Sequence, residues 1–226
     1  MQVMRTRNYR NVGVGMLLGF LLLLLVGMAF AETLLVRETF CEPEGGIPDG
    51  WKATMNEQAT VAIRQVPALA APTCGAALEL ADQSASTFPM LERSFDGGIR
   101  KGAFEYVVLN STDMPGEISG DIRADGVGNV IDCRIDTARS LKCRDGSTLK
   151  TLATGVEYGV WHTVRIEWDT TTWTYRVKLN GADVTPEAGF RFTAQAVPSS
   201  VRFRLGSAAS KVNQKAYIDQ ALVVAY

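Results

Sequence analysis

The feature that most constrains this chain is a two-residue alternation of apolar and polar side chains in short runs. Side chains two positions apart share one face of a strand, so this alternation predicts strands with one buried face. Gly, Asp, Asn and Pro separate the runs, and no long stretch has the helical period. The absence of crossover helices predicts an all-β fold, an antiparallel sandwich. The runs are LLVRETF, ATVAIRQV, AALEL, FPMLERSF, KGAFEYVVLN, GEISGDIRAD, NVIDCRID, SLKCRDG, HTVRIEW, TYRVKLN, GFRFTA, SVRFRLG and AYIDQALVVAY.

Residues 1–31 have the features of a secretory signal peptide. Three arginines lie within the first ten residues, an apolar stretch follows, and Ala29-Phe30-Ala31 fits a small-x-small cleavage site. We expect residues 32–226 to form a single domain that is secreted, either extracellular or periplasmic in a bacterium. An uncleaved anchor is the alternative, but the apolar run is shorter than the ~20 residues that a spanning helix needs. No stable membrane span is therefore expected after cleavage.

The charge of the remaining chain excludes some partners. Residues 1–31 contain three arginines and no acids, so their removal leaves 20 basic and 24 acidic residues, a net charge of −4. Such a chain is not expected to bind nucleic acid or an anionic membrane surface.

Four cysteines predict two disulfides in an oxidising compartment. In DCRIDTARSLKC, placing Cys133 opposite Cys143 also sets Ile135 opposite Leu141 and closes the hairpin with the loop 137–139. Arg134 then faces Lys142, a like-charge pair with a small cost at an exposed site. We predict a cross-strand Cys133–Cys143 bond and, by elimination, a Cys41–Cys74 bond. No zinc-binding pattern is present.

A second hairpin contains His162, the only histidine of the chain. The two-residue period puts His162 on one face with Val164, Ile166 and Trp168, and it puts Trp173, Tyr175, Val177 and Leu179 on one face of the next strand. A loop over 169–172 would place Trp168 opposite Trp173. The same register then places His162, at the far end of its strand, opposite Leu179. The Asn-Gly at 180–181 supplies the next tight turn. We therefore expect His162 to be structural, at the end of an inward row.

This combination resembles the concanavalin A-like lectin/glucanase superfamily, in particular its laminin-G-like modules. The resemblance covers nearly all of residues 32–226, and it implies a jelly roll of two curved antiparallel sheets. It also implies a carbohydrate site on the concave sheet or at the loop edge, although many such modules are not catalytic. The strand with the Trp-His pair is usually structural in that superfamily. The segments that carry the resemblance are ETF, IPDGW, AALEL, LERSFDG, KGAFEYVVL, YGVWHTVRIEWD, YRVKLNG and AYIDQALVV.

Catalytic motifs are incomplete. Glucanases of this superfamily use an E-x-D-x-x-E strand, which places carboxylates on one face for nucleophilic and acid/base roles. Here Glu167 and Asp169 match, but Thr172 stands at the third position. A lyase would need His162 with Tyr158 or Tyr175, and the alternation turns His162 inward. We therefore predict a protein that is not an enzyme.

Binding needs fewer groups than catalysis. Trp51, in the loop after IPDG, is a candidate platform for a sugar ring, and Asp121, Arg123 and Arg134 are candidate hydrogen-bonding partners on the middle strands. The alternatives are that Trp51 packs over the end of the sandwich and that the charges keep one face hydrated.

Two further sites are candidates by motif or resemblance. Related jelly rolls bind calcium between the first and last strands, and Glu38 and Asp219 occupy the matching positions. Their alternative roles are an exposed strand glutamate and an aspartate at a strand end. Asn110-Ser111-Thr112 is an acceptor sequence for N-glycosylation, which matters only in a eukaryotic host. No cofactor other than this calcium is expected.

Three functions remain open. The first is a secreted, non-catalytic jelly-roll module that binds a glycan, such as a cell-surface polysaccharide, or another extracellular surface. The second is an exported hydrolase or lyase that degrades polysaccharides through an unrecognised site. The third is a structural or adhesion protein that contacts other proteins.

Overall fold

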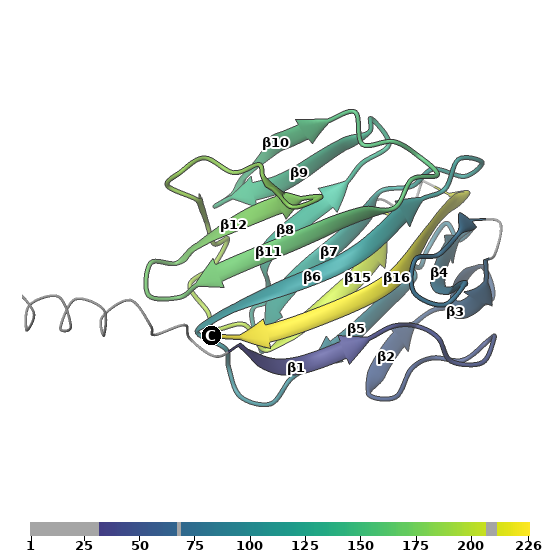
Figure 1. Ribbon diagram of the computed structural model, residues 1–226, viewed down its shortest axis with the longest axis horizontal. Helices are drawn as coiled ribbons and strands as arrows, with labels where there is room; N and C mark the ends of the chain where they lie inside the picture. Colours follow the sequence, from purple (N-terminus) through teal and green to yellow (C-terminus); the bar gives the residue numbers. More distant parts are fainter. Residues whose placement is uncertain (1–31, 67–68, 207–211) are drawn as a thin grey trace, which may run out of the picture. The chain divides into compact units, whose positions relative to one another are not determined.

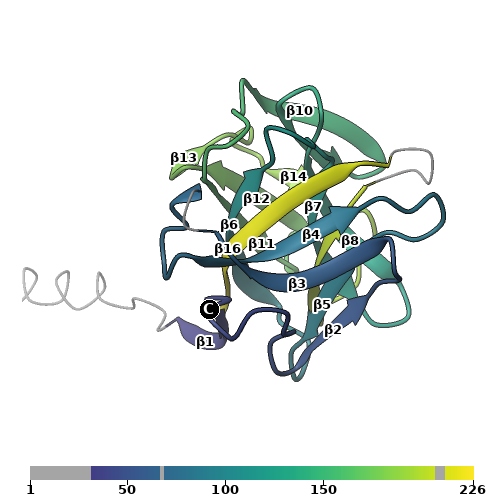
Figure 2. The same cartoon turned by 90° about the vertical axis from the view of Figure 1, so that its right-hand side faces the viewer.

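A computed structural model describes residues 32–66, 69–206 and 212–226, and Glu32–Tyr226 form one compact unit. The expected signal segment 1–31 lies outside the described residues. Two antiparallel sheets stack face to face (Figures 1 and 2), so the predicted all-β sandwich is confirmed. In the described part of the chain, no helix has the length and apolar character needed to cross a membrane.

The first sheet has nine strands, of which seven follow one another in the order β13, β12, β11, β6, β16, β4 and β3. β1 adds to β16, and β14 adds to β12. Its bounds are β1 Thr33–Glu38, β3 Ala59–Gln65, β4 Ala76–Asp82, β6 Lys101–Asn110, β11 His162–Asp169, β12 Thr174–Leu179, β13 Ala182–Asp183, β14 Phe190–Arg191 and β16 Gln214–Ala225.

The second sheet has seven strands in the order β10, β9, β8, β7, β15, β5 and β2. Strands that are distant in the sequence are neighbours here, because β15 pairs with both β7 and β5. Its bounds are β2 Trp51–Thr54, β5 Met90–Ser94, β7 Ile118–Ala124, β8 Gly128–Ile135, β9 Ser140–Asp145, β10 Thr148–Thr154 and β15 Ser200–Leu205.

Aromatic rings from both sheets meet in the core. Phe104 and Tyr106 of β6 lie 5.5 and 5.3 Å from Phe203 of β15, measured between ring centroids. The Tyr106 ring lies against Gly120 of β7, where a Cβ atom would be 2.5 Å from two of its carbon atoms. The glycine therefore leaves the space that the tyrosine ring fills.

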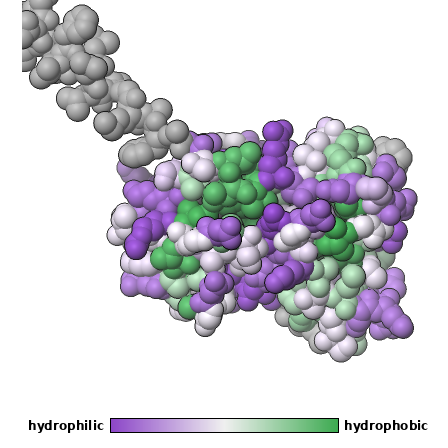
Figure 3. Space-filling view, turned by 90° about the horizontal axis from the view of Figure 1, so that it is seen from below, coloured by the Kyte–Doolittle hydropathy of each residue, from purple (hydrophilic) through white to green (hydrophobic). Residues whose placement is uncertain are grey.

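The surface seen from below carries apolar patches separated by hydrophilic residues (Figure 3). Leu34 and Leu35 of β1 are among the exposed large hydrophobic residues, with 53% and 36% of their surface accessible. Exposed apolar residues are common on protein surfaces, and these carry no functional argument.

The hairpin of β8 and β9 has the predicted register. Cys133 faces Cys143, Ile135 faces Leu141, and Arg134 faces Lys142. The Cys133–Cys143 bond is present, and both cysteines are fully buried. The predicted turn is also present, since the amide of Asp136 donates to the carbonyl of Ser140.

The predicted register of β11 and β12 is wrong by two residues. Trp168 faces Tyr175 rather than Trp173, so the loop covers 170–173, although the inward and outward faces are as predicted. Asp169 holds this arrangement, because its Oδ1 accepts from the amide and hydroxyl of Thr171. Trp173 takes a φ of 55° and packs edge-on against Phe192.

The observed register places Glu167 opposite Arg176, where Glu167 also accepts a hydrogen bond of 3.0 Å from Lys178. It also sets Arg165 opposite Lys178, a like-charge pair whose cost Glu167 offsets, since its carboxylate accepts from both cations. The predicted turn at Asn180 and Gly181 is confirmed by positive φ angles at both residues.

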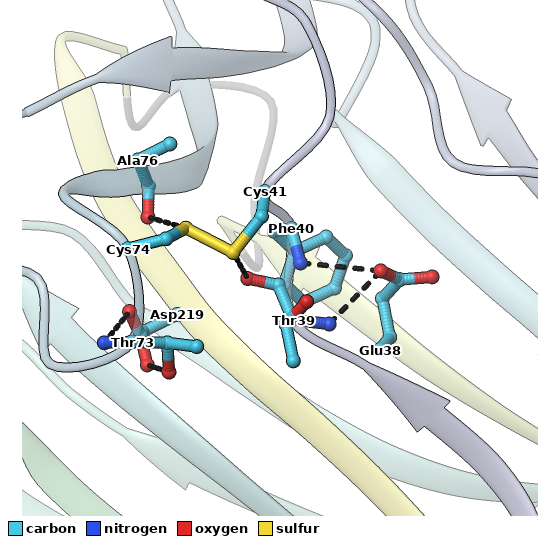
Figure 4. Close-up of a disulfide and its surroundings, with 8 residues drawn as sticks. All are labelled: Glu38, Thr39, Phe40, Cys41, Thr73, Cys74, Ala76 and Asp219. Atoms are coloured by element: carbon cyan, nitrogen blue, oxygen red, sulfur yellow. Dashed lines mark hydrogen bonds between the residues drawn. A yellow bond between two sulfur atoms is a disulfide. The ribbon is translucent and has the colours of Figure 1, made fainter.

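The Cys41–Cys74 bond is present as predicted and joins the segment after β1 to the segment before β4 (Figure 4). Its Cα atoms lie 6.0 Å apart. The bond joins residues 33 positions apart and is expected to stabilise the fold by about 4 kcal/mol in the chain-entropy model.

Gly120→Ala tests the contact between the two sheets. The new Cβ atom would overlap the packed Tyr106 ring, so we expect the free energy of unfolding to fall by about 1–3 kcal/mol, the usual cost of overpacking. Urea unfolding measures this cost. The cost should shrink in a Tyr106→Leu background, and an equal cost in both backgrounds would contradict the packing argument.

Candidate functional site

The outward face of the seven-stranded sheet, here called the polar face, carries a row of charged side chains. Adjacent members of the row from β2 to β8 are cross-strand partners, and an ion pair extends the row to a sixth strand, β9. Alternation explains its position, since Trp51, Leu91, Phe203 and Cys133 occupy inward positions beside it. The charge row consists of Lys52, Glu92, Arg202, Asp121, Asp132 and Arg144.

Arg202 and Asp121 form the centre of the charge row. The Arg202 Nη2 and Nε atoms lie 2.6 and 3.2 Å from Asp121 Oδ2, and Nη2 also donates to Asn129 at 3.0 Å. Asp121 is fully buried, and its Oδ1 has no hydrogen-bond partner. Charge-assisted bonds of this kind hold the guanidinium plane in one orientation.

Arg144 and Arg134 flank Asp132 on the polar face. Arg144 Nε donates to Asp132 Oδ2 at 3.0 Å, while Arg134 Nη2 lies 3.6 Å from the same oxygen. Arg134 Nη1 also donates to Glu117 Oε1 at 2.7 Å. Arg134 is thus an ion-pair partner of two carboxylates and is mostly covered.

Burial raises the pKa of Asp121. Repulsion from the neighbouring carboxylate of Asp132 acts in the same direction, while Arg202 opposes the rise. At the end of β8, Asp136 behaves differently. Although burial opposes it, the hydrogen bonds from Lys142 and from the amides of Ser140 and Ala138 hold the pKa of Asp136 below its usual value.

A groove of about 400 Å³ lies over strands β2, β5, β7 and β15 on the polar face. Glu92 orders it, since its carboxylate accepts from Arg123 and from the hydroxyl of Ser200. All of its lining residues lie on strands, which hold side chains more rigidly than loops do. The lining residues are Lys52, Thr54, Met90, Glu92, Ser94, Arg123 and Arg202.

Two other hollows are less suited to specific recognition. One of about 520 Å³ lies between β10 and the segment 183–190, and three of its nine lining residues lie in the loop 184–186. The other, of about 320 Å³, lies on the outer side of the nine-stranded sheet beside Leu69 and Tyr217. Neither contains an arginine, the residue best shaped for planar polar recognition.

Three of the candidate binding residues, Asp121, Arg123 and Arg134, lie together on the polar face. Trp51 lies in the core instead, with 6% of its surface exposed. Its ring stacks on Phe203 at 6.0 Å, and its Nε1 donates to Glu38. Trp51 therefore packs within the sandwich, the alternative to a sugar platform, and no face of its ring is open to a sugar.

The two calcium candidates, Glu38 and Asp219, each accept hydrogen bonds from neighbouring residues of the chain. Glu38 accepts from the amides of Thr39 and Phe40, and Asp219 accepts from the amide and hydroxyl of Thr73. Figure 4 shows these contacts on different sides of the Cys41–Cys74 bond. Across the described ranges, no three His, Cys, Asp or Glu side chains gather in a way that would hold a metal ion. The carboxylate oxygens that a calcium site needs are therefore used by neighbouring residues.

His162 is buried at the end of its inward row, with 8% of its surface exposed. Its Nε2 donates to the carbonyl of Glu157 at 3.1 Å, which leaves Nδ1 to accept from Asn180 at 3.2 Å. Both ring nitrogens are thus used within the fold, as expected for a structural histidine.

The partial carboxylate triplet lies on the outer face of the other sheet. Glu167 accepts from Arg165 at 2.8 Å and from Lys178 at 3.0 Å. Although burial opposes it, these bonds hold the pKa of Glu167 below its usual value. Asp169 is bound to Lys101 at 2.7 Å. A general acid needs a raised pKa, so this arrangement does not suit glycoside hydrolysis.

Asn110 of the glycosylation sequence is also structural. It is buried, its Nδ2 donates to the carbonyl of Gly116, and its Oδ1 accepts from the amide of the same glycine. The amide nitrogen is therefore inaccessible to a glycosyltransferase once the chain has folded.

Sequence reasoning missed several residues of the site, chiefly Arg202, Glu92, Asp132 and Glu117. The first two have a readable signal, because Arg202 and Glu92 occupy outward positions in SVRFRLG and FPMLERSF. The alternation does not show that these two strands are neighbours in the sheet.

Comparisons with known proteins identify the architecture. No family model matches the chain, and no curated protein matches its sequence. Among solved structures, a sialidase has a TM-score of 0.64 at 15% identity over 78% of this chain, which spans 17% of the sialidase. A carbohydrate esterase from the Shiga toxin-encoding bacteriophage phi24B has a TM-score of 0.63 at 16% identity over 86% of this chain and 99% of its own.

A third similar structure was solved with a sugar bound. Domain 4 of AbnA, a GH43 extracellular arabinanase from Geobacillus stearothermophilus, in complex with arabinotriose, has a TM-score of 0.56 at 14% identity. The match covers 86% of this chain and 93% of that domain. Such low identities establish the fold alone. The chain has the concanavalin A-like jelly-roll fold that its sequence resembles.

His162→Gln tests the structural role of the histidine. Glutamine cannot reproduce both ring contacts, so we expect a loss of about 1–2 kcal/mol in unfolding free energy with unchanged ligand affinity. Thr163→Gln, on the outward face of the same strand, is the control and should melt as the wild type does. A folded His162→Gln protein with unchanged melting but lost binding would contradict the structural assignment.

Asp121 should make the stability depend on pH. Because burial raises its pKa, the folded protein holds this proton more tightly than the unfolded chain does. The resulting stabilisation is complete below the ordinary aspartate pKa of about 3.9 and is lost as the pH rises through the raised value. Asp121→Asn does not titrate, so the unfolding free energy of the wild type should fall relative to that of the variant across this window. Parallel pH profiles in urea unfolding would refute the shift.

Proposed function

We propose that this chain is a secreted, non-catalytic jelly-roll domain that binds carbohydrate in the groove of the polar face. The observation that carries the proposal is a groove of about 400 Å³ lined by oriented guanidinium and carboxylate groups. Sugar hydroxyls pair well with such planar polar groups, and the volume lies within the range of small-ligand sites. The similar arabinanase domain, whose structure contains arabinotriose, supports a sugar as ligand.

Secretion is supported by the two disulfides and by the signal-like residues 1–31. Disulfides form and persist mainly in oxidising compartments. A polysaccharide outside the cell is therefore the partner that fits best.

Absence of catalysis is supported by the state of the carboxylates. Asp121 and Asp132 are cross-strand neighbours, and one of them has a raised pKa, which resembles the carboxyl pair of a glycosidase. Asp121 is fully buried, however, so its carboxyl group cannot contact a glycosidic oxygen. Asp132 is occupied by Arg144 and Arg134.

Thr54→Gln tests the location of the site. This exposed threonine lies on the edge strand β2 and lines the groove, so a longer neutral side chain should obstruct a sugar and weaken binding about tenfold on a glycan array. Thr148→Gln, an equally exposed position on the other edge strand, is the matched control and should bind as the wild type does.

The same glycans should yield no reducing ends on incubation with the wild-type protein. Release of reducing sugar would overturn the non-catalytic part of the proposal. Failure to bind any glycan would overturn the carbohydrate part and favour protein contacts.

A further inference from the structure

The charges of the polar face are unbalanced in favour of cations. Each carboxylate has a cationic partner: Glu92 with Arg123, Asp121 with Arg202, Asp132 with Arg144, Glu117 with Arg134, and Asp136 with Lys142. Two cations remain beyond these five pairs. The seven cationic side chains are Lys52, Arg123, Arg134, Lys142, Arg144, Arg202 and Arg204.

The two remaining cations are Lys52 and Arg204. Neither forms an ion pair or a side-chain hydrogen bond within residues 32–66, 69–206 and 212–226. They lie on the two strands that flank β5, because Lys52 of β2 faces Glu92 and Arg204 of β15 faces Met90, two residues earlier on β5. Lys52 lines the groove, and Arg204 is the cross-strand neighbour of its lining residue Met90, so Arg204 adjoins the groove on the β15 side.

Arg204 has the geometry to bind a carboxylate. It stands two residues after Arg202 on β15 and on the same face, and Arg202 already holds Asp121 through Nε and Nη2. The Arg204 Nε has no acceptor, and an unpaired N–H group of this kind is costly. Because this Nε is buried, a ligand carboxylate would have to reach the guanidinium through its Nη atoms.

The groove lacks the alternative means of holding a sugar. Its seven lining residues include no aromatic ring, and Met90 is the only apolar one. Stacking against a sugar face therefore contributes little, and recognition depends on charge and hydrogen bonds. Two cations on the strands that flank β5 suit the single carboxylate of an acidic sugar.

We infer that the ligand of the polar face is a carboxylated glycan, whose carboxylate binds between Lys52 and Arg204. This inference rests on the proposed function, since it names the class of carbohydrate that the groove takes. Attraction to the two unpaired cations also makes binding sensitive to ionic strength.

Matched ligands test the inference without altering the protein. Titration calorimetry would compare polygalacturonate, hyaluronan and polysialic acid with their carboxyl-reduced forms, which keep the polymer and lose the charge. At least one acid form should bind about tenfold or more tightly than its reduced form, and added salt should weaken that binding. Dextran sulfate is included to separate carboxylate recognition from binding to any polyanion.

A pair of double variants tests the residues. Lys52→Met/Arg204→Met should lower affinity for the acid form about tenfold or more and leave any binding of the reduced form unchanged. Arg37→Met/Arg100→Met makes the same change in net charge away from the groove and should bind as the wild type does. Circular dichroism melting establishes that both proteins are folded.

The outcomes distinguish the two proposals. Equal binding of acid and reduced forms, or unchanged affinity in the folded Lys52/Arg204 variant, would overturn the carboxylate inference and leave carbohydrate binding intact. Binding of dextran sulfate without any carboxylated polymer would also overturn it. No binding of any acidic or neutral glycan would overturn the inference and the proposed function together.

Discussion

The packing of aromatic rings between the two sheets is the contact on which the rest of the molecule depends. Phe203 of β15 meets Phe104 and Tyr106 of β6, and each ring occupies an inward position of its strand. Because neighbouring side chains on a strand point to opposite faces, burial of Phe203 turns Arg202 and Arg204 outward. The core contact therefore sets which residues make up the polar face, and the space left by Gly120 keeps the sheets at the distance that this packing needs.

The charged groups of the polar face contribute more to fixing the orientation of their side chains than to the stability of the fold. Removing Asp121 from water costs free energy that its bond to Arg202 returns only in part, as its raised pKa indicates. What the pair provides is orientation, because a guanidinium held through two nitrogens cannot turn. Glu92 holds Arg123 at the edge of the groove through one nitrogen, Nη1. A binding surface made of long, flexible side chains thus acquires fixed positions before any ligand arrives.

The sequence predicts local features of this fold well and distant ones poorly. Alternation identifies the faces of β11 and β12, and it identifies the register of β8 and β9 because Cys133 and Cys143 must meet. The register of β11 and β12 was missed by two residues, since it depends on how Asp169 binds Thr171 and Lys101. The charge row was missed because it joins strands as far apart as β2 and β15, and no local pattern contains such pairings. Trp51 was expected in a loop, but it begins a strand that buries its ring.

The Cys133–Cys143 bond lies directly beneath the charge row. Cys133 stands between Asp132 and Arg134, and Cys143 stands between Lys142 and Arg144, so the covalent link sets the spacing of four charged side chains on the opposite side of the sheet. Reduction would leave β8 and β9 joined by their strand pairing and by ion pairs such as that of Arg144 with Asp132, without a covalent link. The arrangement of the polar face is thereby coupled to the redox state of its surroundings, and a chain that stays in a reducing compartment loses the covalent support for this part of its surface.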